Sequence, residues 1–256
     1  MKNLYNLNGK VALVTGSSSG MGKAIAEALG VHGATVIVSS NDTEGCIKVA
    51  NDFENNGIDA ISIPCDISKE SEIDTLVNNS IKKAGKIDIL VSCVGIAKPG
   101  TFEDISSAEF ERIMNFNVRS GIYLTQKVLP QMIKRKDGVL IYLSSISSVR
   151  GNKHIGLYGI SKASLVQLAK NLAVEYGPDN IRANAISPGL IDTPFSESLM
   201  QQEEFMKKRL GQTPLRRVGK PEEIAGVAVM LASKAGAFVT GQNIIVDGGT
   251  TISDGN

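Results

Sequence analysis

Cysteine, histidine and tryptophan are scarce in this chain of 256 residues, which has three cysteines, two histidines and no tryptophan. Cys46, Cys65 and Cys93 are too few and too widely spaced for a disulfide framework. The chain has no CxxC motif and no Cys/His cluster, so we expect no metal site. Reduced cysteines are typical of the cytosol, and we therefore expect a cytoplasmic protein.

Excess charge of one sign and long apolar runs are also missing. The net charge is +1, with 27 Lys+Arg against 26 Asp+Glu residues, so we expect neither a nucleic acid nor a membrane as partner. No run of about 18 apolar residues occurs, which argues against a membrane span. Residues 1–10 are polar and lack the apolar centre of a signal peptide.

Short β-branched runs alternate with longer helical segments along the chain. We predict strands at 11–14, 34–39, 60–63, 87–92, 139–143, 181–186 and 243–246. We predict helices at 20–32, 43–56, 68–84, 106–135, 157–176 and 221–233. Such alternation gives right-handed βαβ units with helices on both faces of a parallel sheet. We therefore expect a single α/β domain over residues 1–256, with a Rossmann-type doubly wound parallel sheet.

Some local features refine this pattern. Ser68 is a possible cap of the helix at 68–84, and Ser106 and Ser107 are start signals for the long helical stretch at 106–135. Residues 192–214 are polar, rich in Met, Gln and Glu, and interrupt the alternation. We interpret that segment as a lid-like insertion over the substrate.

A glycine-rich turn, Thr15-Gly-Ser-Ser-Ser-Gly-Met-Gly22, joins the first strand to the first helix. Glycines let the backbone approach a pyrophosphate closely, and the helix N-terminus supplies unpaired N–H groups. The turn alone could be a plain strand-to-helix connection, but its place in the first βαβ unit favours dinucleotide binding. The predicted cofactor contacts in this turn are Gly16, Ser18, Ser19, Gly20 and Met21.

The end of the second strand bears on the choice of nicotinamide cofactor. Ser40 stands where an acid would accept the ribose hydroxyls, and Asn41 stands where an arginine would pair with a 2′-phosphate. Neither the acidic residue nor the basic residue is present at these two positions, and we favour NADP(H) over NAD(H). Asp42 is interpreted as a helix cap. Asp66, followed by Ile67, either meets the adenine amine or serves as a turn acid.

Tyr158 and Lys162 are four residues apart on a predicted helix and therefore share one face. The neighbouring ammonium is expected to lower the tyrosine pKa from its usual value near 10. Tyr158 can then give a proton to a carbonyl or take one from an alcohol. Ser145, at the end of the fifth strand, can hydrogen-bond the substrate oxygen. The alternative, a packed tyrosine beside a solvated lysine, loses weight because Ser145 and the phosphate turn are also present.

Together these motifs resemble the classical short-chain dehydrogenase/reductase family. The matching features are the glycine-rich turn, Ser145, Tyr158-Gly-Ile-Ser-Lys162, Pro188-Gly189 and Val246-Asp-Gly-Gly249, so the resemblance covers about residues 9–249. Carbonyl reductases, which are tetrameric, and 3-oxoacyl reductases are the most similar branches. One motif departs, because the family's Asn-Asn-Ala-Gly is replaced by Ser92-Cys-Val-Gly95, which keeps only the glycine.

The resemblance implies roles for further residues. Asn117 matches an asparagine that holds a water in a proton relay to the lysine, although it could instead satisfy a helix kink, and Asn115 competes for the role. Lys162 would also hold the nicotinamide ribose hydroxyls. Thr193 would contact the nicotinamide carboxamide or cap a helix. The remaining implied cofactor contacts are Gly95, Pro188, Gly189 and the backbone of Ile191.

We therefore predict an NAD(P)(H)-dependent oxidoreductase that interconverts a carbonyl and an alcohol of a small molecule by hydride transfer, assembled as a homotetramer. One alternative is a 3-oxoacyl-[acyl-carrier-protein] reductase. The loop at 177–180 contains Asp179 where a positive charge would favour an acidic carrier, which weighs against it. A catalytically silent cofactor-binding scaffold is a second alternative, but such a protein should have lost Tyr158, Lys162 or Ser145.

Overall fold

A parallel sheet of seven strands forms the centre of the computed structural model, which describes residues 3–254. The strand order is β3-β2-β1-β4-β5-β6-β7, and every neighbouring pair is parallel. The order reverses between β1 and β4, where parallel sheets open a crevice at the carboxyl ends of the strands. The strands are β1 (Val11–Thr15), β2 (Thr35–Ser39), β3 (Ala60–Ser62), β4 (Ile89–Ser92), β5 (Gly138–Leu143), β6 (Ile181–Pro188) and β7 (Asn243–Val246).

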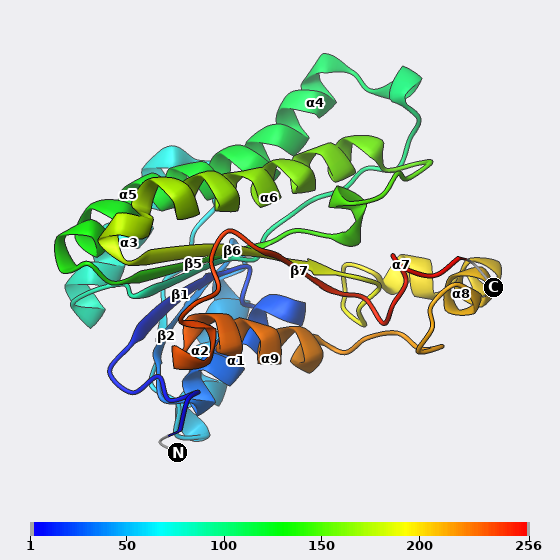
Figure 1. Ribbon diagram of the computed structural model, residues 1–256. Helices are drawn as coiled ribbons and strands as arrows, with labels where there is room; N and C mark the ends of the chain where they lie inside the picture. The colour runs from blue at the N-terminus through cyan, green and yellow to red at the C-terminus, as the bar shows by residue number, and fades with distance from the viewer. Residues whose placement is uncertain (1–2, 255–256) are drawn as a thin grey trace.

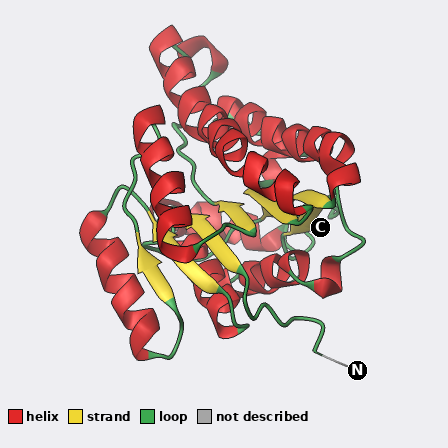
Figure 2. Cartoon of the chain, turned by 90° about the vertical axis from the view of Figure 1, so that its left-hand side faces the viewer, coloured by secondary structure: helices red, strands yellow, loops and turns green. Residues whose placement is uncertain are grey.

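Helices cover both faces of this sheet (Figures 1 and 2). One layer contains α3 (Glu70–Ala84), α5 (Ser120–Arg135) and α6 (Gly156–Tyr176), and the other contains α1 (Gly20–Val31), α2 (Thr43–Asn55) and α9 (Pro221–Ala232). Successive residues of β1 point to opposite layers, Leu13 into the first core and Val14 into the second. Burial on both faces explains why the strands are almost uniformly apolar. The predicted doubly wound α/β fold is therefore confirmed.

The helical stretch predicted at 106–135 is not one regular helix. It consists of α4 (Ser107–Met114), a π-helical turn η2 (Asn115–Arg119) and α5. Ser106 caps α4, since its hydroxyl accepts a hydrogen bond from the backbone N–H of Glu109 at 3.2 Å. The expected regular helix was therefore wrong at the π-turn, which no hydrophobic period reveals.

The capping predictions for two other helices have opposite outcomes. Asp42 caps α2 as expected, because its carboxylate accepts from the N–H of Gly45 at 2.9 Å. The expectation for Ser68 was wrong, because α3 begins at Glu70 after Lys69. Ser68 instead donates from both its N–H and its hydroxyl to the Asp66 carboxylate, at 3.0 and 2.7 Å.

The segment at 192–214 folds into two short helices, α7 (Glu197–Met200) and α8 (Glu203–Gly211). Figure 1 shows them beside the sheet and apart from the two helical layers. The 3-10 turns are η1 (Phe102–Asp104), η3 (Ile146–Ser148), η4 (Gly177–Asp179) and η5 (Lys234–Gly236). Across residues 3–254, no helix combines the length and apolarity needed to cross a bilayer.

Candidate active site

A long cleft follows the carboxyl ends of the central strands, from the glycine-rich turn to the side chains of Tyr158 and Phe195. Its empty space, including the part open to solvent, is about 1170 Å³. The predicted site residues that line it are Gly16, Ser19, Gly20, Met21, Ser40, Asn41, Asp66, Ile67, Gly95, Tyr158, Lys162 and Thr193. The structure thus brings these residues, from six parts of the chain, into one continuous cleft.

The glycine-rich turn has the geometry that a pyrophosphate requires. Gly16 has a φ of +71°, and a Cβ there would lie 2.4 Å from the Cys93 carbonyl oxygen. A Cβ on Gly22 would lie 2.1 Å from the Gly16 carbonyl oxygen. The N-cap residue of α1, Ser19, makes no side-chain capping hydrogen bond within the described part of the chain. The first N–H groups of α1 therefore suit an anion, and the turn fits the phosphates of a dinucleotide.

The part of the cleft that follows β2, beside the glycine-rich turn, has no acid at position 40. Ser40 accepts a hydrogen bond from the N–H of Asp42 at 3.2 Å, and its hydroxyl lies 3.4 Å from the Asn41 amide oxygen. Asp66 lines the cleft, and its hydrogen bonds with Ser68 hold its pKa below the usual value. Asp66 therefore acts as a turn acid, and the same carboxylate also faces the space for the cofactor.

Tyr158 and Lys162 lie one turn apart on α6. The Lys162 Nζ lies 5.7 Å from the centre of the Tyr158 ring. It donates hydrogen bonds to the carbonyl oxygens of Leu143, at 2.8 Å, and Val94, at 3.1 Å. Only 3% of Lys162 is exposed. The ends of β4 and β5 therefore fix the ammonium at the floor of the cleft.

Burial controls the pKa of both groups. It raises the pKa of Tyr158 to about 12, against a smaller lowering by the hydrogen bond with Ser145. Burial also lowers the pKa of Lys162 to about 8. The expectation that Lys162 lowers the Tyr158 pKa was therefore wrong for the protein alone, because desolvation of the phenolate dominates and the ammonium faces the ring and two carbonyls. Tyr158 is consequently a neutral phenol, ready to donate a proton.

Ser145 is the serine that contacts Tyr158. Its backbone is extended, with φ −167° and ψ 157°, and its Oγ accepts from the N–H of Ser147 at 3.1 Å. The neighbouring hydroxyls serve the backbone, since Ser144 donates to the Lys162 carbonyl at 2.8 Å and Ser148 donates to the Ser145 carbonyl at 2.7 Å. The hydroxyl of Ser145 is thus the one that the fold places beside the phenol.

Asn117 lies in the π-turn and is 2% exposed. Its amide nitrogen donates to the Ile96 carbonyl and to the Ser161 hydroxyl, both at 2.9 Å, and its amide oxygen accepts from the Ile96 N–H at 2.8 Å. The side chain therefore ties the loop after β4 to α6. None of these bonds goes to the backbone of its own helix, so they do not match the helix-kink alternative, and the water relay stays a prediction.

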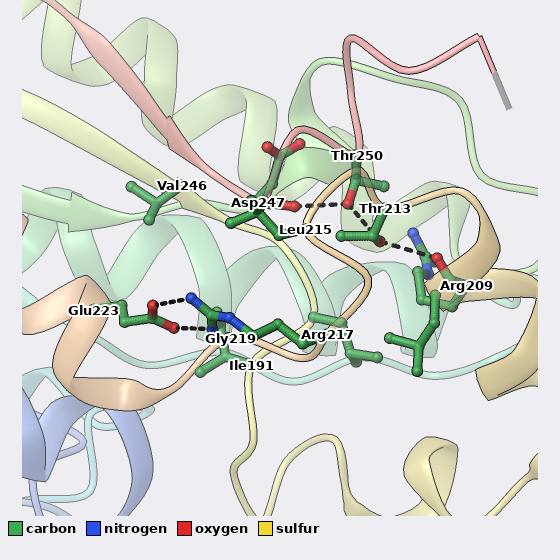
Figure 3. Close-up of a pocket in the computed structure, with 13 residues that line it drawn as sticks. Ile191, Arg209, Thr213, Leu215, Arg217, Gly219, Glu223, Val246, Asp247 and Thr250 are labelled. Carbon is green, nitrogen blue, oxygen red and sulfur yellow. Dashed lines mark hydrogen bonds and ion pairs between the residues drawn. The ribbon is translucent and has the colours of Figure 1, made fainter. Parts of the chain in front are cut away.

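The predicted residues at the end of β6 and in the loop after it lie in two places, the main cleft and the side of the sheet near β7. Thr193 is buried and lines the cleft, and its hydroxyl lies 3.2 Å from that of Ser196. Gly189 packs against Asp247, where a Cβ would lie 2.8 Å from the aspartate Cα. Ile191 lines a second pocket on the side of β7 (Figure 3). Ser18, Asn117, Ser145, Pro188, Gly189 and Ile191 do not line the main cleft.

Several cleft residues escaped the sequence prediction. They are Val94, Ile96, Phe116, Leu143 and Pro194. The signal that could have found them is position, because most lie at or just after the carboxyl ends of β4 and β5. Burial raises the pKa of Cys93, which also lines the cleft, to about 12, so this thiol is unreactive. Phe195 lines the cleft as well, and its ring lies 6.2 Å from that of Tyr158.

Comparisons with known proteins agree with this geometry. The family model described as "Enoyl-(Acyl carrier protein) reductase" matches residues 16–251. The 7alpha-hydroxysteroid dehydrogenase of Escherichia coli (strain K12) is 38% identical over 243 residues, covering 95% of this chain and 94% of that protein.

Two solved structures are similar over nearly their whole length. A 7alpha-hydroxysteroid dehydrogenase complexed with NADH and 7-oxo glycochenodeoxycholic acid has a TM-score of 0.93 at 37% identity, covering 97% of each chain. A gluconate 5-dehydrogenase from Burkholderia cenocepacia, in complex with NADP and tartrate, has a TM-score of 0.95 at 28% identity, covering 98% of each chain.

The chain belongs to the short-chain dehydrogenase/reductase family. It is an oxidoreductase that uses a nicotinamide cofactor to interconvert a carbonyl and an alcohol.

Proposed function

We propose that this protein is an NADP(H)-preferring carbonyl reductase in which Tyr158 is the acid/base, Ser145 and Lys162 assist it, and Asn117 positions the site. The observation that carries the proposal is that Tyr158 and Lys162 line the end of the cleft that begins at the phosphate turn, with Ser145 hydrogen-bonded to Tyr158. The cleft fits an extended dinucleotide, which supplies or accepts a hydride when it is bound.

The chain's own residues move the proton. In the direction of reduction, the neutral phenol of Tyr158 donates its proton to the carbonyl oxygen while the carbonyl carbon is reduced. The Ser145 hydroxyl hydrogen-bonds the same oxygen and stabilises the charge that develops on it. The Lys162 ammonium stabilises the phenolate left on Tyr158. In oxidation the phenolate takes the proton of the alcohol, so the same three groups serve both directions.

Other residues would hold the cofactor and enclose the substrate. We assign the phosphates to Gly16, Ser18, Ser19, Gly20 and Met21, the adenosine end to Ser40, Asn41, Asp66, Ile67 and Gly95, and the nicotinamide end to Lys162, Pro188, Gly189, Ile191 and Thr193. The segment 192–214 serves as the lid. Phe195 at its start already packs beside Tyr158, so movement of this segment would open or close the place where the proton is transferred.

The preference for NADP(H) rests on the absence of a carboxylate at Ser40. A carboxylate at this place accepts ribose hydroxyls and repels a 2′-phosphate. Ser40 and Asn41 instead offer neutral donors toward the cleft. Similar solved structures contain NADP in one case and NADH in another, so these two side chains of this chain are the basis of the proposal.

The substrate is proposed to be a small carbonyl compound or the corresponding alcohol, such as the steroid or sugar-acid substrates named for the relatives. The family model carries an acyl-carrier-protein description, so a 3-oxoacyl-[acyl-carrier-protein] reductase is the second candidate. Asp179 in η4 places a negative charge in the loop before β6, which weighs against docking of an acidic carrier. We propose a homotetramer, as the resemblance implies, and a cytoplasmic location, which fits the three free cysteines.

The test is a panel of ketones, aldehydes, 3-oxoacyl thioesters, steroids and sugar acids, measured with NADPH and NADH. Tyr158→Phe should fold and bind NADPH but lose at least about a thousandfold in kcat, since general acid catalysis contributes about 10²–10⁴-fold and the phenol also orients the carbonyl. Tyr176→Phe, at the far end of α6, is the matched control and should keep wild-type turnover. Retained activity of Tyr158→Phe would remove the role assigned to this residue.

A further inference from the structure

Two arginines that have no acidic partner within residues 3–254 lie on chain segments that adjoin the proposed active site. Arg150 follows η3, the short turn that begins directly after Ser145, and its N–H donates to the Ile146 carbonyl at 3.2 Å. Arg209 lies on α8, within the segment that starts with the cleft residues Thr193 and Phe195. Each of the two segments that adjoin the proposed acid/base therefore contributes one guanidinium.

Neither guanidinium is neutralised by this chain. Over residues 3–254, neither Arg150 nor Arg209 forms an ion pair, and Arg150 Nε, Arg209 Nε and one terminal nitrogen of Arg209 are buried without a hydrogen-bond acceptor. The charge of Arg150 and burial both lower the pKa of Arg209, burial more strongly, which shows that the two charges are close. Buried donors are almost always satisfied in folded proteins, so this arrangement calls for an external acceptor.

The acids nearest to Arg209 have other partners. Arg209 lines the second pocket together with Arg217, Glu223 and Asp247 (Figure 3). Both carboxylate oxygens of Glu223 bind Arg217, at 2.8 and 2.6 Å. The Asp247 carboxylate accepts from two backbone N–H groups, of Gly249 at 2.9 Å and Thr251 at 2.7 Å. Within this pocket Arg217 therefore forms an ion pair with Glu223, whereas Arg209 forms none with the residues that the structure describes.

The position of Arg209 is also restrained. Its guanidinium lies over the Phe205 ring, 5.4 Å from the ring centre, and such stacking orients the planar group while leaving its edge donors free. Arg209 is on a helix, and Arg150 is anchored through the η3 turn. The Arg209 guanidinium is therefore oriented, and the backbone that carries Arg150 is fixed, before any ligand arrives.

We propose that Arg150 and Arg209 bind an anionic group of the substrate, so that the enzyme acts on carbonyl compounds or alcohols that carry a carboxylate or phosphate. This inference rests on the proposed function, because it assigns the substrate class of that same site. Guanidinium groups recognise carboxylates and phosphates through paired, charge-assisted hydrogen bonds. An anion between the two arginines satisfies the buried donors and cancels their repulsion at once.

Binding is tested with tartrate and its uncharged dimethyl ester, each titrated by calorimetry into the full-length protein saturated with NADP⁺. The wild type should bind tartrate at least about tenfold more tightly than the ester, the loss expected for one charge-assisted contact. Arg150→Met and Arg209→Met should each remove this preference, and Arg209→Lys should keep part of it. Lys207→Met, an exposed lysine on the same helix, is the control and should behave as the wild type. Equal binding of the acid and the ester by the wild type, or an unchanged preference in both methionine variants, overturns the proposal.

A second readout separates the substrate from another occupant, an acid of a second copy of the chain. The melting temperature without ligand should be unchanged or higher in the methionine variants, because one of two repelling charges is gone. A lower melting temperature together with a smaller assembly in light scattering would show that a neighbouring subunit fills the site, and would also overturn the proposal.

The panel of carbonyl compounds then tests the anion site and the proposed function separately. Arginine-dependent binding of tartrate with no turnover of any panel member would leave the anion site standing and refute the proposed function. Turnover of neutral and anionic members with equal kcat/KM, unaffected by Arg209→Met, would leave the function standing and refute the anion site. If the anion site and the proposed function are both correct, KM for the anionic substrates should rise about tenfold or more in Arg209→Met, with a smaller change in kcat.

Discussion

Gly95 is the one residue of its motif that this chain shares with the family, and Gly95→Ala tests why. A Cβ at this position would lie 2.9 Å from Lys162 Nζ and 3.2 Å from its Cε, with the Asn117 amide oxygen at 3.7 Å. Real Cβ atoms do not approach other atoms to 2.9 Å. The lysine is the flexible partner, so we expect its ammonium to move and the backbone to stay.

The size of the effect follows from the bonds that Lys162 would lose. Its ammonium is held by the carbonyls of Leu143 at 2.8 Å and Val94 at 3.1 Å. A hydrogen bond to a charged group contributes about 1.5–3 kcal/mol. If that amount is lost from the transition state, kcat/KM falls by about 10- to 150-fold. The free energy of unfolding should fall by about 0.5–2.5 kcal/mol, because the restriction of the unfolded chain by alanine offsets only part of the lost hydrogen bonding.

The assay combines steady-state kinetics, on whichever panel substrate is turned over, with urea unfolding. Gly100→Ala is the matched control in the same loop, since its Cβ would meet nothing nearer than Asp104 Cβ at 3.8 Å. It should keep wild-type kcat/KM. Wild-type activity of Gly95→Ala, or an equal loss in both variants, would refute the argument that the position of the lysine ammonium limits the reaction.

Three further outcomes are expected. In reduction, kcat/KM should be constant below pH about 8 and fall above it, because Lys162, with its pKa lowered to about 8, loses the charge that stabilises the Tyr158 phenolate. Lys162→Arg should move this falling limb to higher pH, and an unmoved limb in the pH profile would contradict the assignment. Ser40→Asp should lower the NADPH/NADH ratio of kcat/KM by at least about tenfold, because a carboxylate repels the 2′-phosphate; an unchanged ratio would place the discriminating contact elsewhere. Asp88→Ala should lower the free energy of unfolding by about 3 kcal/mol, since this 2% exposed carboxylate accepts from the Val11 N–H at 2.9 Å and pairs with Arg135 at 3.2 Å; denaturant titration with the partly exposed Asp52→Ala as control measures the difference.

The fold could be predicted from sequence because its signals are local and repeated. Each strand is a short apolar run between helical periods, and a parallel sheet with two helical layers is the only common arrangement that buries both faces of every strand. The capping prediction failed at Ser68 because a nearby acid, Asp66, competes for its hydroxyl and N–H. A cap depends on which acceptor lies closest in space, and the spacing of residues along the chain does not contain that information.

The candidate site was predictable to the extent that its residues follow strand ends or share one helix face. Tyr158 and Lys162 meet because four residues make about one helical turn. The direction of the tyrosine pKa was mispredicted because it depends on burial and on where the ammonium points, and both are set by β4 and β5 rather than by α6. The unpaired arginines 150 and 209 carry no signal in the sequence, since whether an arginine has an acid beside it is a property of the folded chain.

The π-helical turn at Asn115–Arg119 shifts the helical phase within the continuous helical stretch formed by α4, this turn and α5. One extra residue within a turn rotates everything before it by about 100° relative to everything after it. The apolar stripes of α4 and α5 therefore need not belong to one continuous line, and each helix can meet different neighbours. A deletion of one residue in this turn would restore a regular helix, swing the Asn117 amide away from Ile96, and leave the loop after β4 without its brace, although every residue of the sheet would be unchanged.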